Sequence, residues 1–228
     1  MKKMENNQNG KRELFLGGTF ILMFIVWTML ILTVDVQAIG VNGTEVGMAA
    51  FNSRFHELTG INLVIYTVTD WLGLVPIFVC LIFAGTGCEQ LIKRRSLFKV
   101  DYDIIFLGIY YLVVILGYLI FEMYPINYRP VLIEGILEAS YPSSTTLLVL
   151  AVMPTLVEQS NRRIANALAK RWIMIFAVCF AVLMIAGRLI SGVHWFTDIV
   201  GACLLSAGLF LNYKGAVLWW NFTKNCRN

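Results

Sequence analysis

The sequence predicts an all-α integral membrane protein with six transmembrane helices and with both termini in the cytoplasm. Of its 228 residues, 58% are hydrophobic and only 14% are charged, and the apolar residues form long runs rather than half-buried periodic faces. No repeat, low-complexity tract or long linker interrupts these runs. We therefore expect a single polytopic membrane domain that covers residues 1–228.

Six apolar runs approach the length that crosses about 30 Å of hydrocarbon, and each run predicts one helix. They cover residues 14–34, 63–84, 104–123, 143–157, 172–189 and 197–211. The fourth run rises only about 22 Å at roughly 1.5 Å per residue, so we expect its N-terminus to be recessed below the outer interface. Residues 51–61 predict a short amphipathic helix on the outer surface.

The lysines and arginines are divided unequally between the two sides of this map. Fifteen of the eighteen lie in the N-terminus, the second and fourth loops and the C-terminal tail, which the positive-inside rule assigns to the cytoplasm. The other three, Arg54, Arg129 and Arg188, lie in the first, third and fifth loops, which are then extracytoplasmic. This asymmetry accounts for the net charge of +4, so no nucleic-acid partner is indicated.

An arginine, a histidine and a carboxylate lie at fixed spacing between the fifth and sixth runs. His194 and Asp198 are four residues apart, so on a helix they share one face, and Asp198 can accept the Nδ1 proton while Nε2 points elsewhere. Arg188 adds a planar cation that suits bidentate binding of a phosphate. These three residues predict phosphoryl chemistry with a histidine nucleophile. The cysteines show no C-x-x-C spacing, and neither a metal nor a cofactor is expected.

Two further outer segments indicate the same chemistry. Asn127-Tyr128-Arg129-Pro130 follows the third run, and Tyr141-Pro142-Ser143-Ser144-Thr145 opens the fourth. A proline followed by two serines is typical of a helix start, where unpaired N–H groups and the positive end of the helix dipole attract an anion. A phosphate site is therefore expected at this end of the fourth helix.

Together these segments resemble the type-2 phosphatidic acid phosphatase superfamily of membrane lipid phosphatases, over a core of about residues 102–213. The family pattern is a lysine, six residues and Arg-Pro, then Pro-Ser-Gly-His, then an arginine, five residues, a histidine, three residues and an aspartate. Arg129-Pro130 matches the end of the first element and Pro142-Ser143 the start of the second. The third element is matched by Arg188, His194 and Asp198.

The resemblance implies a role for each matching residue. His194 would attack phosphorus and form a phosphohistidine, Asp198 would orient it, and Arg129 and Arg188 would neutralise the charge on the equatorial oxygens. Ser143 and the backbone of Ser144 would complete the phosphate cradle. The substrate would be a phosphorylated membrane lipid, and no metal would take part.

The chain departs from the family pattern at two positions with chemical roles. Glu122 stands where the family has its lysine, and Thr145 stands where the family has the histidine that protonates the leaving group. Loss of general-acid help typically costs about 10²–10⁴ in rate, which favours a diphosphate lipid or another good leaving group. Glu122, Glu134 or Glu138 could supply the proton if burial held it neutral.

For each of these carboxylates, and for two other polar residues, a structural role is the alternative. Glu134 and Glu138 would then be solvated loop residues, and Glu122 would pair with Arg129 or another cation. Asp70, within the second predicted helix, is expected to make a structural hydrogen bond. His56 is expected to be a surface residue.

Three functions remain open from the sequence. The first is a lipid phosphatase of the cell membrane that acts on an isoprenoid diphosphate or a phospholipid phosphate at the extracytoplasmic face. The second is a lipid-phosphate-binding scaffold or carrier of the same fold that has lost turnover. The third is a phosphotransferase that passes the phosphoryl group to an acceptor other than water.

Overall fold

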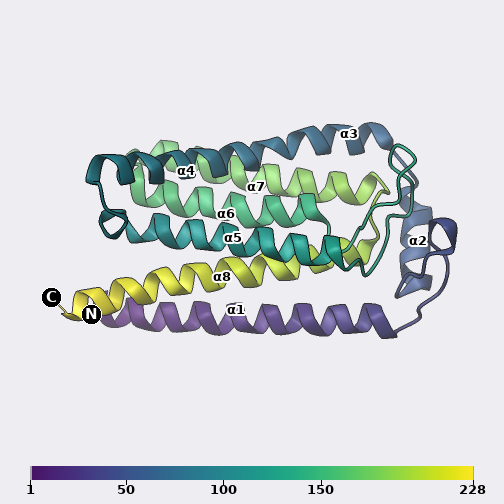
Figure 1. Cartoon of the computed structure of the whole chain (residues 1–228), viewed down its shortest axis with the longest axis horizontal. Coiled ribbons are helices and arrows are strands. Elements are labelled where there is room, and N and C mark those ends of the chain that lie inside the picture. Colours follow the sequence, from purple (N-terminus) through teal and green to yellow (C-terminus); the bar gives the residue numbers. More distant parts are fainter. Residues whose placement is uncertain (1, 228) are drawn as a thin grey trace.

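The protein is a bundle of long helices that run alongside one another (Figure 1). The computed structural model describes the backbone of residues 2–227 and the side chains of residues 8–224, so the predicted cytoplasmic side chains of Lys2, Lys3 and Arg227 lie outside the described residues. The elements are α1 (Lys2–Thr33), η1 (Val41–Gly43), α2 (Ala49–Thr59), α3 (Leu63–Leu72), α4 (Leu74–Arg94), η2 (Leu97–Lys99), α5 (Tyr102–Met123), α6 (Ser144–Arg163), α7 (Ala167–Ile190) and α8 (Phe196–Arg227). The described backbone has isolated β-bridges and no strand, which confirms the all-α prediction.

Five segments within the described residues are long and apolar enough to cross a membrane. They are Gln8–Thr33, Leu63–Arg94, Tyr102–Met123, Ala167–Ile190 and Phe196–Lys224. The chain is thus a multi-pass membrane protein. The fourth predicted span, which corresponds to α6, is not among the five, so the count of six stays a prediction.

Helix α6 is less apolar because it packs inside the bundle, where α4, α5, α7 and α8 surround it. Its polar side chains find partners on these neighbours: Thr155 bonds the hydroxyl of Tyr111 at 2.6 Å, and Gln159 donates to the hydroxyl of Tyr213 at 3.0 Å. The helix has 20 residues, which is about 30 Å. Helix α6 is therefore longer than the predicted run of residues 143–157, and the added turns, which continue to Arg163, lie at its C-terminal end. The recessed position expected for its N-terminus stays a prediction.

Helices α1 and α8 also extend beyond their predicted ends, and they lie side by side along the bundle (Figure 1). Glu13 and Lys214, outside the apolar runs, form an ion pair at 2.9 Å between the two helices. Gly17 permits the close approach, because a Cβ atom there would lie 2.7 Å from the side chain of Asn212. Pairing between helices, rather than hydropathy, determines these ends.

The second predicted helix is divided at Gly73 into α3 and α4. The N–H of Gly73 donates to the carbonyl groups of Thr69 and Asp70, so the break is a local irregularity in a continuous rod. Helix α3 packs against α7, and α4 packs against α6. This arrangement brings the last turn of α3 close to the start of α6.

The two ends of the bundle differ in character. The N- and C-terminal ends of the described chain lie at one end, together with the α4–α5 and α6–α7 connections (Figure 1). The opposite end carries α2, the α5–α6 loop and the α7–α8 turn. The predicted short helix over residues 51–61 is confirmed as α2, two residues earlier in the chain. The loops with most of the predicted cytoplasmic charge thus lie at the end away from α2.

Candidate active site

The α5–α6 loop, residues 124–143, folds into an irregular hairpin that presents Arg129. Bridges between Tyr128 and Ala139 and between Ile133 and Ile136 hold its two arms together. The N–H of Arg129 donates to the carbonyl of Glu138, and its Nη2 lies 3.0 Å from the carboxylate of the same residue. The Arg129 side chain is buried, so the hairpin places a guanidinium inside the end of the bundle.

Arg188 lies at the end of α7 and is 1% exposed. Its Nη2 donates to Asp70 on α3 at 2.8 Å and to the hydroxyl of Thr145 on α6. The ring of Tyr66, one turn before Asp70, lies 4.9 Å from Cζ of Arg188 and 5.5 Å from Cζ of Arg129. The two guanidinium groups therefore share one aromatic neighbour and lie in a single site.

His194 lies in the turn between α7 and α8, because α8 begins at Phe196. The prediction that His194 and Asp198 share a helical face is therefore wrong. Asp198 lies in the first turn of α8, where its carboxylate accepts from the N–H of Trp195 at 2.9 Å and from the amide of Asn127 at 3.3 Å. Its Oδ2 is 3.7 Å from Nδ1 of His194, which is close but longer than a hydrogen bond.

The electrostatic environment keeps the imidazole of His194 neutral. Burial lowers the pKa of His194 from 6.5 to about 4, and the charges of Arg129 and Arg188 act in the same direction. Asp198 opposes this shift without cancelling it. At neutral pH the ring therefore carries a lone pair that can act as a nucleophile.

Six nitrogen atoms in this site are buried and have no hydrogen-bond partner among the described residues. They are Nε and Nη1 of Arg129, Nε and Nη1 of Arg188, and both ring nitrogens of His194. Buried polar groups are almost always paired, so a cluster of unpaired donors on two cations indicates a binding site for an anion. Each guanidinium binds its own carboxylate through Nη2 and keeps the remaining donors free.

The start of α6 contributes backbone groups to the same region. Leu147 N–H donates to Ser143 carbonyl, so the N–H groups of Ser144 and Thr145 precede the first bond of the helix. Ser143 is fully buried and donates its hydroxyl to Thr146 at 3.0 Å, while its N–H donates to the carbonyl of Asp198. The Ser143 hydroxyl is thus used in a hydrogen bond within the first turn of α6 and does not offer a free donor to the anion site.

The structure places the candidate acids differently from the sequence analysis. Glu138 is half-buried and pairs with Arg129, so its predicted solvated position is wrong, and it takes the place expected for Glu122. Glu122 is exposed at the end of α5, and Glu134 is exposed at the tip of the hairpin with φ +51°. The hydrogen bond expected for Asp70 is the one to Arg188.

The sequence analysis did not identify Tyr66 as a site residue, and it gave no role to Asn127. Asn127 belongs to the segment that contains Arg129, and its amide is the second side-chain contact of Asp198. Tyr66 is four residues before Asp70, so both point from one face of α3. That spacing was the one signal available in the sequence.

A cavity of about 350 Å³ adjoins the site between α3–α4, α5 and α6. Its polar end is formed by Asp70, Ser144 and Thr145, and most of its remaining lining is apolar. Leu74 and Ile115 in this lining are about half exposed, so the cavity reaches the lipid-facing surface of the bundle. Its lining suits an apolar chain with a polar head group.

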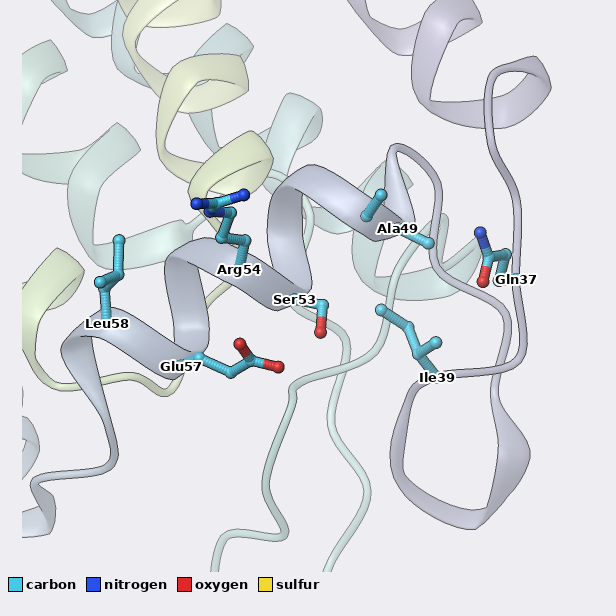
Figure 2. A pocket seen from close by; sticks show the side chains of 8 residues that line it. Gln37, Ile39, Ala49, Ser53, Arg54, Glu57 and Leu58 are labelled. Atoms are coloured by element: carbon cyan, nitrogen blue, oxygen red, sulfur yellow. The ribbon is translucent and has the colours of Figure 1, made fainter.

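Helix α2 covers the turn that contains His194. Nε2 of His56 donates to the carbonyl of Gly192 at 3.0 Å, and the His56 ring packs on Trp195 at 5.5 Å. His56 is half-buried, so its predicted surface position is wrong. The same helix forms, on another face, an open groove of about 590 Å³ lined by Arg54 and Glu57 (Figure 2). The groove contains none of the site residues.

Among the side chains of residues 8–224, no group of three His, Cys, Asp or Glu residues is arranged to hold a metal ion. The fold and the site together define a multi-pass helical membrane protein with a buried cluster of two arginines and a histidine, a candidate anion site, at one end of the bundle.

The model of the PAP2 superfamily matches residues 98–226, and the chain belongs to this superfamily. The resemblance found in the motifs is thereby confirmed. The fold is similar to that of the crystal structure of the first transmembrane PAP2 type phosphatidylglycerolphosphate phosphatase from Bacillus subtilis, with 18% identity and a TM-score of 0.62. The similarity covers 88% of this chain and 95% of that one. No curated protein sequence matches the chain.

Proposed function

We propose that the protein hydrolyses a lipid phosphate or diphosphate at the extracytoplasmic face of the cell membrane, through a phosphohistidine on His194. The substrate class is an isoprenoid diphosphate or a phospholipid phosphate. The main support is the cluster of six buried, unpaired nitrogen atoms on Arg129, Arg188 and His194. An anion with several acceptor oxygens satisfies the four arginine nitrogens among them, and a phosphoryl group has that form. The neutral ring of His194 supplies a lone pair instead.

In the proposed reaction, the free donors of Arg129 and Arg188 bind the phosphate oxygens and neutralise the charge that develops on them. The neutral ring of His194 attacks phosphorus through Nε2 while the lipid oxygen leaves on the opposite side. Asp198, held by Trp195 and Asn127, stabilises the imidazolium that forms. Water then attacks the phosphohistidine and releases phosphate.

The apolar cavity supports a lipid rather than a soluble substrate. It begins at Asp70 and Thr145, beside Arg188, and continues along apolar side chains to the lipid-facing surface. A lipid whose phosphate occupies the arginine site would place its chains there. In the proposed topology of six spans with cytoplasmic termini, this end of the bundle faces the outside.

Phosphate release by the purified protein in detergent tests this proposal. The substrates are phosphatidic acid, phosphatidylglycerol phosphate and undecaprenyl diphosphate. We expect release on at least one, and we expect His194→Ala to lower it by at least about 10³-fold while the folded protein persists. Arg54→Ala, on the exposed groove of α2, is the matched control and should behave as the parent. Equal release by His194→Ala and parent would contradict the mechanism.

Thr145 supports a second candidate function, because the family resemblance places the acid at that position. The chain would then bind lipid phosphate without turnover. We expect such a protein to bind the same lipids with an affinity that Arg129→Ala and Arg188→Ala weaken. The absence of phosphate release on all three substrates, together with such binding, would favour this candidate over the phosphatase.

Labelling in intact cells tests the sidedness. A membrane-impermeant maleimide should modify a Glu134→Cys variant, whose position is the exposed tip of the hairpin, and should leave an Asn166→Cys variant unmodified until the membrane is opened. The parent gives the background from the natural cysteines. The reverse pattern would place the site in the cytoplasm.

A further inference from the structure

We propose that Asp70 is the general acid and base of the reaction, and this inference rests on the proposed phosphatase function. In the first step its carboxyl group would donate a proton to the leaving oxygen of the lipid. In the second step its carboxylate would accept a proton from the attacking water.

The position of Asp70 between the arginine site and the apolar cavity supports this role. Its Oδ1 accepts from Nη2 of Arg188 at 2.8 Å, and its side chain also lines the polar end of the cavity, where it is 57% exposed. In a phosphorylated lipid, the leaving oxygen joins the phosphorus to the apolar part of the molecule. If phosphorus lies at the arginines and the chains lie in the cavity, that oxygen lies at the border that Asp70 occupies.

The other carboxyl groups near the site are less suited to this step. Asp198 is fully buried, and its two oxygens accept from Trp195 and Asn127. Glu138 binds Arg129 from the hairpin and does not line the cavity. Glu122 and Glu134 are exposed, and neither forms an ion pair with a site arginine in the described structure. Asp70 alone among these five combines contact with a phosphate-binding arginine and access to the cavity.

Thr145 has the right position but the wrong chemistry for proton transfer. Its hydroxyl contacts the same Nη2 of Arg188 as Asp70 does, so the two side chains are neighbours. A threonine hydroxyl is too weak an acid to protonate a leaving group at neutral pH, whereas a carboxyl group can do so. The charged neighbour of Asp70 is Arg188, and a bound phosphate brings a second anionic group to that cation. At this cation the carboxyl group of Asp70 and the bound phosphate would lie close enough to exchange a proton.

The proton balance closes over the two steps. In the first, the bond between His194 Nε2 and phosphorus forms, the bond between phosphorus and the lipid oxygen breaks, and the Asp70 proton moves to that oxygen to give an alcohol. In the second, water oxygen bonds to phosphorus, the bond to Nε2 breaks, and one water proton returns to Asp70. No other reactant is needed.

The dependence of rate on the leaving group tests the inference. In single-turnover reactions with enzyme in excess, we compare Asp70→Asn with the parent on dihexanoyl phosphatidic acid and on p-nitrophenyl phosphate. The first has an alkoxide leaving group that needs a proton, and the second has a phenolate that does not. We expect about 10²–10⁴-fold slower reaction of the phosphatidic acid and nearly unchanged release of p-nitrophenol.

Asparagine can still accept the hydrogen bond from Arg188, so the variant keeps this contact while it removes the ionisable carboxyl group. Glu57→Gln, on the open groove of α2, is the matched control and should leave both rates at the parent value. Asp70→Glu, which retains a carboxyl group, should recover part of the rate on phosphatidic acid.

The possible results distinguish failure of the inference about Asp70 from failure of the proposed function. An equal loss on both substrates would show that Asp70 positions Arg188, and an unchanged rate on both would show that it has no role; either result overturns the inference. A parent enzyme that releases nothing from either substrate, or whose activity does not depend on His194, would instead overturn the proposed function.

Discussion

Replacement of His194 by glutamine should change how the stability of the protein depends on pH. The pKa of His194 is lowered from 6.5 to about 4 by burial and by the two neighbouring arginines. Between these values the unfolded chain binds a proton that the folded chain does not. The stability that the neutral ring contributes is therefore complete above pH 6.5 and is lost as the pH falls towards 4.

The magnitude follows from the size of the pKa shift. A difference of about 2.5 units corresponds to about 3 kcal/mol over the whole window, and to about 2 kcal/mol at pH 5. For a protein of this size, about 2 kcal/mol is about 4–8 °C in the midpoint of thermal unfolding. Between pH 7.5 and pH 5, the midpoint of the parent should thus fall about 4–8 °C more than that of His194→Gln.

Tryptophan fluorescence of the two proteins in the same detergent measures these midpoints. The pKa of Asp35 is lowered by the hydrogen bond from Ala50, and the pKa of Asp101 is lowered by the hydrogen bond from Arg94. The contribution of both carboxylates to the free energy of unfolding also falls towards acid pH. Because both residues are present in parent and variant, these contributions cancel in the difference between the two proteins. Parallel pH curves for parent and variant would refute the neutral, buried imidazole. Inorganic phosphate should reduce the difference at pH 5, because an anion at the arginines favours the imidazolium.

Three further predictions concern the neighbours of the site. Asn127→Ala removes the amide that holds Asp198 and should lower kcat about 10-fold with little change in KM, as steady-state kinetics would show. Tyr66→Leu removes the ring beside both guanidinium groups and should weaken inhibition by inorganic phosphate several-fold, and unchanged inhibition would exclude this contribution. Thr145→His in the Asp70→Asn background should recover part of the lost rate on phosphatidic acid but leave p-nitrophenyl phosphate unaffected.

The sequence was sufficient to predict the class of fold and the approximate place of each long helix. Runs of apolar residues report contact with lipid, and five of the six predicted spans have that character in the structure. Hydropathy did not predict the full length of helices that contact protein instead of lipid. Helix α6 is surrounded by other helices, and α8 continues past residue 211 because it packs along α1. The ends of these helices depend on partners such as Glu13 and Lys214, which lie 201 residues apart.

Only those residues of the anion site that stand out as polar groups in an apolar sequence could be predicted. Arg129, Arg188 and His194 are rare polar groups in an apolar chain, and the structure brings all three together. The contact between Asp70 and Arg188 joins residues 118 apart and exists because α3 packs on α7, which no local pattern reveals. Glu138 rather than Glu122 pairs with Arg129 because the hairpin places it opposite that residue.

The formal charge of the site connects these observations to the role of Asp70. Two guanidinium groups are accompanied by three carboxylates, Asp70, Glu138 and Asp198, while His194 is neutral. With all three carboxylates ionised the resting site carries a formal charge of −1, and a phosphate dianion would take it to −3, which is costly beside the buried His194 and Asp198. A phosphate that arrives with one proton adds one charge fewer to this site. Asp70 lines the cavity through which the lipid would enter and contacts Arg188, so it is in place to pass a proton to the leaving oxygen.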